Sequence, residues 1–213
     1  MTPSLDPRDP RVKWTSDAVA RRYAGERWSS AARRGRDPRR VQRILAEFLP
    51  RGTALLLDAP CGAGRLVPAL AARGRTVALD VSPAMLSALR ASPTRPDLVL
   101  AGDIAHLPFR DDAFDAVLCC RYLHHLREPA ALARALSELV RVSRGLVVAS
   151  FWDSASLPEW RRALPGARVP RRCARPRAEL ARACAAAGAE VVAWRHSLRF
   201  VSRQAYLVAR KRP

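Results

Sequence analysis

Short apolar runs alternate with amphipathic segments along the chain, and this alternation predicts both kinds of secondary structure. The apolar runs end at turn residues and are too short for buried helices, which is typical of strands in a parallel sheet. They cover residues 54–58, 76–80, 97–103, 114–120, 145–152, 190–197 and 199–210. The last two runs follow each other closely, so we expect them to pair antiparallel.

The segments between the runs repeat apolar side chains at helical spacing. They predict helices over residues 15–28, 37–49, 64–74, 82–92, 128–142 and 177–188. Asp37 and Ser82 are the expected N-caps, each followed by a proline that suits the first turn. The sequence RRGR before Asp37 is expected to separate two helices, and Gly74 is expected to end a helix.

Strands and helices in this order predict an α/β fold. We expect one mostly parallel sheet of seven strands, with helices on both faces and an antiparallel strand at the C-terminal end. Residues 1–50 are expected to form an N-terminal helical cap. Its first ~13 residues are rich in Pro and charge, so we expect them to be disordered.

Composition limits the class of protein to which this chain can belong. It has 213 residues, of which 49% are hydrophobic, enough for one domain with a substantial core. No apolar run approaches the ~20 residues of a membrane span, and the start lacks the apolar core of a signal peptide. Five cysteines without a disulfide pattern favour the cytoplasm, and no Cys/His cluster has the spacing of a metal site.

The formal net charge is +19, and the excess is concentrated at one end. Residues 153–213 carry 14 basic and 4 acidic side chains, and nearly all the basic ones are arginine. Two interpretations remain open. The excess is either a functional face that binds anions or a solvated surface that follows a bias in composition.

Carboxylates follow three successive predicted strands. Asp58, Asp80 and Asp103 fall at or just after strand ends, and the carboxyl ends of parallel strands meet at one edge of a sheet. Three acidic side chains are therefore expected to face one crevice.

The stretch LLLDAPCGAGRL contains Gly62 and Gly64 but places Val67 where a dinucleotide fingerprint has its third glycine. An Asp before this loop would also repel a pyrophosphate, whereas it would favour an ammonium group. A ligand with an amino group, a ribose and an adenine but no phosphate fits better. S-adenosylmethionine is such a ligand.

Four segments of the sequence together resemble the motifs of a known family. The segments LLLDAPCGAGRL, VALDVSPAML, AGDIAHLPF and FDAVLCCRYLHHL are similar to successive motifs of class I S-adenosylmethionine-dependent methyltransferases. The nearest branch includes quinone-biosynthesis and other small-molecule enzymes, and the resemblance covers about residues 54–152. It implies a Rossmann-like fold, a methyltransferase domain over residues 51–213, and a substrate-lid insertion at 153–176.

The resemblance also implies which residues bind the cofactor. The methionine part would be held by Tyr23, Asp58, Ala59, Gly62, Gly64, Cys120 and Arg121. The adenosine part would be held by Asp80, Val81, Met85, Asp103 and Ile104. Asp80 would accept hydrogen bonds from both ribose hydroxyls, as the two oxygens of a carboxylate permit. Tyr23 equally suits a core position.

His124 and His125 are the candidate catalytic bases, because they follow the fourth strand and histidine titrates near neutral pH. The alternative is that both histidines pack or cap a helix.

The predicted function is methyl transfer to O, N or C of a small metabolite, for which arginines in 153–176 would suit an anionic group. The alternative is an RNA-modifying methyltransferase whose Arg-rich C-terminal region binds phosphates, although no RNA-binding module is evident. A third reading is a cofactor-binding protein without catalysis. The oligomeric state stays open.

Overall fold

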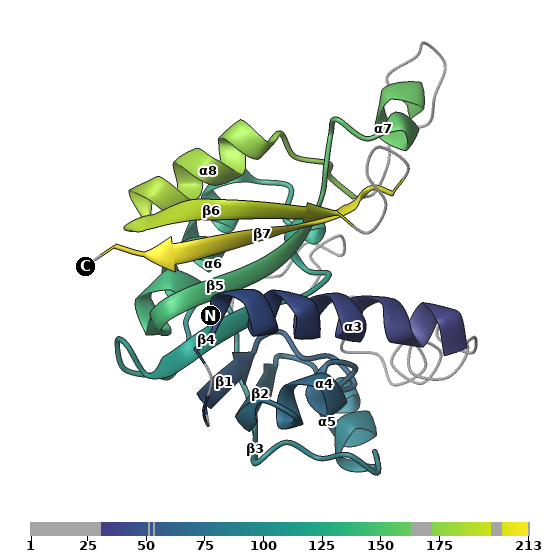
Figure 1. The fold of residues 1–213 in the computed structure, drawn as a ribbon, viewed down its shortest axis with the longest axis vertical. Helices are drawn as coiled ribbons and strands as arrows, with labels where there is room; N and C mark the ends of the chain where they lie inside the picture. The colour runs from purple at the N-terminus through teal and green to yellow at the C-terminus, as the bar shows by residue number, and fades with distance from the viewer. Residues whose placement is uncertain (1–30, 51, 53, 163–171, 197–201, 213) are drawn as a thin grey trace, which may run out of the picture.

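The computed structural model describes residues 31–50, 52, 54–162, 172–196 and 202–212. A seven-stranded sheet runs through the middle of this part of the chain (Figure 1). Its strands are β1 (Ala54–Asp58), β2 (Gly74–Asp80), β3 (Leu98–Ala101), β4 (Phe114–Cys119), β5 (Ser143–Trp152), β6 (Ala189–His196) and β7 (Gln204–Lys211). The order across the sheet is β3-β2-β1-β4-β5-β7-β6.

Strands β1 to β5 are parallel, whereas β7 runs antiparallel to both β5 and β6. This arrangement confirms the predicted fold class, a Rossmann-like, mostly parallel sheet with an antiparallel C-terminal strand. The carboxyl ends of β1, β2, β4 and β5 consequently lie along one edge, where ligands of such sheets bind.

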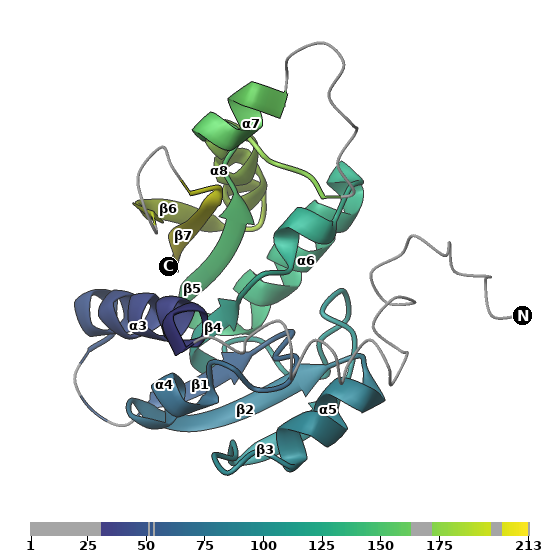
Figure 2. The ribbon, with the colours of Figure 1, turned by 90° about the vertical axis from the view of Figure 1, so that its right-hand side faces the viewer.

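Helices cover both faces of the sheet (Figure 2). They are α3 (Ala31–Phe48), α4 (Val67–Ala71), α5 (Pro83–Arg90), α6 (Pro129–Val142), α7 (Leu157–Arg162) and α8 (Arg177–Ala186), with a 3₁₀ turn at Leu123–His125. Apolar side chains of α3, α4 and α5 pack on one face, and those of α6 and α8 pack on the other. Of the helices described, none is both long enough and apolar enough to cross a membrane.

Helix α3 corrects the prediction of its start. It begins at Ala31 and continues through the sequence RRGR, so Asp37 and Pro38 lie within the helix and not at its first turn. Asp37 is no cap: its carboxylate is 1% exposed and bound to side chains of other elements. Packing of the apolar face of α3 on the sheet outweighs the backbone hydrogen bond that Pro38 cannot make. The predicted helix at 15–28 lies outside the described residues.

Gly74 does not end a helix, because α4 stops at Ala71 and Gly74 begins β2. A Cβ atom on Gly74 would lie 2.0 Å from the carbonyl oxygen of Ala54, its partner in β1. The close approach of the two backbones therefore requires glycine here. The predicted ends of β3, β5 and β7 shift by a few residues, and α7 is a helix that was not predicted.

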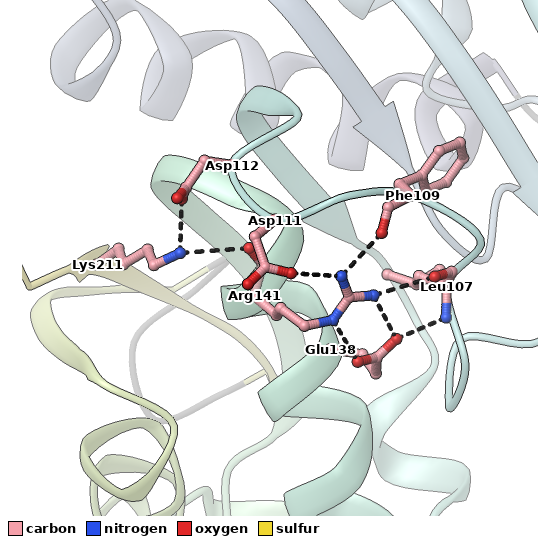
Figure 3. A network of polar contacts seen from close by, with 7 residues as sticks. All are labelled: Leu107, Phe109, Asp111, Asp112, Glu138, Arg141 and Lys211. Atoms are coloured by element: carbon pink, nitrogen blue, oxygen red, sulfur yellow. Dashed lines mark hydrogen bonds and ion pairs between the residues drawn. The ribbon is translucent and has the colours of Figure 1, made fainter.

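The connection between β3 and β4 is held by one arginine of α6 (Figure 3). Arg141 donates hydrogen bonds to the carbonyl oxygens of Leu107 (3.0 Å) and Phe109 (2.8 Å) and to the carboxylate of Glu138. Glu138 in turn accepts a hydrogen bond of 2.7 Å from the amide of Leu107. This pair fixes the course of a loop that begins with the predicted adenine contacts.

We expect Arg141→Ala to lower the free energy of unfolding by about 2 kcal/mol, because it leaves carbonyl groups of the loop without their donor. Urea denaturation followed by circular dichroism measures the change. The control is Arg134→Ala, an exposed arginine of the same helix, for which a change within about 0.5 kcal/mol is expected. Equal midpoints for the two variants would contradict this role of Arg141.

Candidate cofactor site

Two of the three predicted carboxylates end neighbouring paired strands. Asp58 is the last residue of β1 and Asp80 the last residue of β2. Asp103 follows β3 closely and is partly buried, and its Oδ1 accepts a hydrogen bond of 2.9 Å from the amide of Ala105. The structure thus brings the three acids to one edge of the sheet.

Asp80 ties together the two turns that follow β1 and β2. Its Oδ2 accepts a hydrogen bond of 2.8 Å from the amide of Gly62, and its Oδ1 accepts one of 2.9 Å from the amide of Ser82. Burial raises the pKa of Asp80, while these amide donors act to lower it. Each carboxylate oxygen keeps a lone pair for a further donor, such as a ribose hydroxyl.

Asp58 is buried without a hydrogen-bond donor among the described residues. It is 1% exposed, and both of its oxygens are unpartnered in the part of the chain that the structure describes. Burial raises the pKa of its carboxyl group to about 8; the cation of Arg65 opposes this rise, and Asp80 adds to it. A buried acid without donors favours a cationic ligand group, which would stabilise the ionised form.

The other residues predicted to contact adenine follow β2 and β3. Val81 and Met85, predicted to pack on the ring, are partly exposed and 3% exposed, and Ile104, whose amide is predicted to donate to the ring, is 4% exposed. Ser82 caps α5 as predicted, since its Oγ accepts a hydrogen bond of 3.2 Å from the amide of Met85. Their contact with an adenine ring stays a prediction.

The turn after β4 has an unusual backbone. Arg121 has a φ of 62°, which residues other than glycine rarely adopt. Its amide donates a hydrogen bond of 2.6 Å to Ser150 Oγ, and its Nε donates one of 2.6 Å to Asp37 Oδ2. The Sγ of neighbouring Cys120 lies 3.7 Å from Ser150 Oγ, and burial raises the pKa of this thiol to about 11.

A buried polar cluster beneath the site was not predicted. The carboxylate of Asp37 accepts hydrogen bonds from the guanidinium groups of Arg65 and Arg121 and from the hydroxyl of Tyr206. Arg65 immediately follows the glycine loop, residues 59–64 after β1, and Tyr206 lies in an apolar strand where its hydroxyl requires a partner. Those two features of the sequence could have revealed the cluster. It was missed because Asp37 before Pro38 has the pattern of a helix cap.

The structure packs His124 into the interior. This side chain is 2% exposed, and its ring lies parallel to that of Trp152, with centroids 4.9 Å apart. His125 lies beside it, with ring centroids 4.5 Å apart, and is partly buried. The packing supports the structural interpretation of His124, and a catalytic role for either histidine stays a prediction.

Residues 153–162 and 172–176 of the predicted lid are among those that the structure describes. Arg175 is 6% exposed and donates to the carbonyl oxygens of Leu126 (2.6 Å) and Arg127 (2.7 Å), so it links the segment before α8 to the segment before α6. Trp160, on α7, is 64% exposed. Residues 163–171 and the predicted Tyr23 lie outside the described residues.

We expect Asp80→Ala to weaken binding of S-adenosylhomocysteine by about 2–3 kcal/mol, which is roughly 30- to 150-fold. The variant loses the predicted acceptor for the ribose and the observed link between the two turns. Isothermal titration calorimetry measures the affinity. The control is Asp97→Ala, at an exposed carboxylate just before β3 that also accepts a backbone hydrogen bond, from Thr76, but lies outside the predicted site. Unchanged affinity in a folded Asp80→Ala protein would contradict the assignment.

Similarity to known proteins agrees with this geometry. Residues 57–148 match a family model described as a methyltransferase domain. The demethylmenaquinone methyltransferase of Thermobifida fusca is 34% identical over 144 residues, which are 65% of this chain and 58% of that protein. A tRNA (carboxymethyluridine(34)-5-O)-methyltransferase of Arabidopsis thaliana is 31% identical over 121 residues, 54% of this chain and 29% of that protein. The chain spans less than two thirds of the length of these relatives.

Solved structures share the fold. The magnesium protoporphyrin IX methyltransferase of Synechocystis, solved with bound SAH, superposes with a TM-score of 0.76 at 18% identity, over 97% of this chain and all of that one. The methyltransferase solved in complex with the Trm112 activator of Haloferax volcanii gives 0.70 at 20% identity, over 93% and 96%. The methyltransferase-domain match over residues 57–148, on a chain with this fold, confirms the resemblance of the motifs to those of class I S-adenosylmethionine-dependent methyltransferases.

Proposed function

We propose that the protein transfers a methyl group from S-adenosylmethionine to an O, N or C atom of a small anionic metabolite. The observation that supports S-adenosylmethionine as the cofactor is the pair of buried acids at the ends of neighbouring strands. Asp58 suits the cationic methionine part and Asp80 suits the ribose. Residues 1–50 as a cap, 153–176 as a lid and a cytoplasmic location are parts of the same proposal.

Methyl transfer needs little from the protein beyond alignment of the acceptor atom with the methyl group of the cofactor. The bound cofactor supplies a methyl group already activated by a sulfonium. The glycine loop and the turn after β4 would orient its methionine part, while the apolar side chains around Met85 and Ile104 would exclude water. An O or N nucleophile would lose its proton to a base, for which His125 is the more accessible of the two candidates.

The end of β5 supports an anionic acceptor. The guanidinium carbons of Arg172 and Arg203 lie 5.3 and 5.1 Å from the centre of the Trp152 ring. Arg203 also pairs with Glu159 of α7, at 2.9 Å. Arginines held beside an indole at the edge of the sheet suit recognition of a carboxylate or phosphate.

One observation favours RNA as a second candidate substrate. The basic excess of residues 153–213 would neutralise several phosphates, and one relative is named as a tRNA methyltransferase. Binding to single-stranded RNA would then weaken with salt at a slope of about −0.7 per phosphate contacted.

Label transfer from S-adenosylmethionine into pools of anionic metabolites or into unmodified RNA tests the two candidates. If the proposal holds, the label enters a metabolite, and Arg172→Ala and Arg203→Ala raise the KM of that compound. Arg182→Ala, an exposed arginine of α8, is the matched control. Salt-sensitive labelling of RNA would overturn the choice of a metabolite, and absence of cofactor binding would overturn the proposal as a whole.

A further inference from the structure

The carboxylate of Asp37 joins three segments that are distant in sequence. It lies in α3, before the residues that match the methyltransferase model, and it is 1% exposed. Its Oδ2 accepts hydrogen bonds from Arg65 and Arg121, and its Oδ1 accepts one from Tyr206 of β7. The two arginines belong to the loop after β1 and to the turn after β4.

These two backbone segments are the ones expected to hold the methionine part of the cofactor. Arg65 directly follows Gly64, so anchoring its side chain restrains the end of the glycine loop. Arg121 has a left-handed backbone, held at its amide by Ser150 and at its side chain by Asp37. Asp37 therefore fixes both segments from one point.

The charge state of Asp37 fits this role. Burial acts to raise the pKa of its carboxyl group, but the neighbouring Arg65 and Arg121 cations and the Tyr206 hydroxyl prevail and lower it. The group is consequently ionised at neutral pH, and its removal would leave two partly buried guanidinium groups without their common acceptor.

We propose that Asp37 is a positioning residue that sets the methionine subsite through Arg65 and Arg121, without touching the cofactor itself. The inference rests on the proposed function, because it presupposes that S-adenosylmethionine binds at this edge of the sheet. It extends the site to α3, an element outside the family match. It also predicts that the adenosine part of the site depends much less on Asp37, since Asp80 is also held by the amide of Ser82, and Ser82 caps α5 outside the cluster.

Two ligands separate this role from a general structural one. S-adenosylhomocysteine contains the amino-acid part, whereas 5′-methylthioadenosine lacks it. We expect Asp37→Asn to weaken binding of S-adenosylhomocysteine by about tenfold or more, while the affinity for 5′-methylthioadenosine changes by less than about twofold. Calorimetry with both ligands gives the two ratios. Glu47→Gln, which breaks an exposed pair between α3 and Arg195, is the matched control and should leave both affinities unchanged.

The outcomes are distinguishable. If the wild-type protein binds neither ligand, the proposed function fails. If the wild-type protein binds both ligands, and Asp37→Asn weakens both affinities equally or leaves both unchanged, the positioning role is overturned. Should Asp37→Asn fail to fold, Arg65→Gln removes one arm of the cluster, at a residue outside the predicted cofactor contacts, and must show the same selective loss for S-adenosylhomocysteine.

Discussion

Gly64→Val is expected to abolish measurable binding of S-adenosylhomocysteine and to lower the free energy of unfolding by about 4 kcal/mol. Gly64 has a φ of +77°, a conformation that a β-branched residue avoids. A Cβ atom there would also lie 2.1 Å from Cδ1 of Leu89 in the core under α5. The Leu89 side chain is fully buried, so the strained backbone and this contact together favour a shift of the loop away from the position in which its backbone would meet the cofactor.

Thermal unfolding with and without ligand measures both effects. The wild-type protein should gain stability as the ligand concentration rises, and the variant should not. Gly145→Val is the matched control, because a Cβ atom at Gly145 meets nothing within 4 Å. If the ligand stabilised Gly64→Val as strongly as the control, the glycine loop would not be the binding site.

Asp58→Asn is expected to remove a large pH dependence of stability. Burial raises the pKa of Asp58 from 3.8 to about 8, so the folded protein holds a proton that the unfolded chain releases. The stability from this group is complete below pH 4 and is lost as the pH rises to about 8, at roughly 1.4 kcal/mol per pH unit. The Asn variant should lack this slope and should therefore be more stable relative to wild type at pH 8 than at pH 5.

Urea denaturation at several pH values between 5 and 8 gives the two slopes. Asp111→Asn, at a carboxylate that is 68% exposed, should retain the slope of the wild-type protein. A saturating cationic ligand should flatten the wild-type slope, because it favours the ionised form of Asp58. Identical slopes for wild type and Asp58→Asn would show that this carboxyl group is already ionised near pH 5.

Local pattern was sufficient where neighbouring residues decide the structure. The run ALLLD predicted β1 to the residue, because a buried parallel strand needs only an apolar stretch and a turn. Ser82 before a proline predicted the start of α5, because the capping bond reaches only to Met85. The acids at the strand ends followed from the same alternation, and the structure places them on one edge.

Pattern failed where a distant partner decides. Asp37 before Pro38 has the form of a helix start, yet its carboxylate serves residues from other parts of the chain. Gly74 has the form of a helix end, but the backbone of Ala54 across the sheet explains it. In both cases the local signal is the usual one, and only the assembled sheet shows which contact prevails.

The bond between Tyr206 and Asp37 also bears on the order in which the protein folds. The two residues are 169 positions apart, and β7 enters the sheet between β5 and β6. During synthesis α3 and the glycine loop emerge long before β7 exists, and contacts of such sequence separation form slowly. A nascent chain that has not reached Tyr206 lacks one of the three donors to Asp37, so under the proposed positioning role its methionine subsite would be incomplete. Cofactor affinity would then arise at the end of folding, and ligand binding to ribosome-bound chains of increasing length would report its last step.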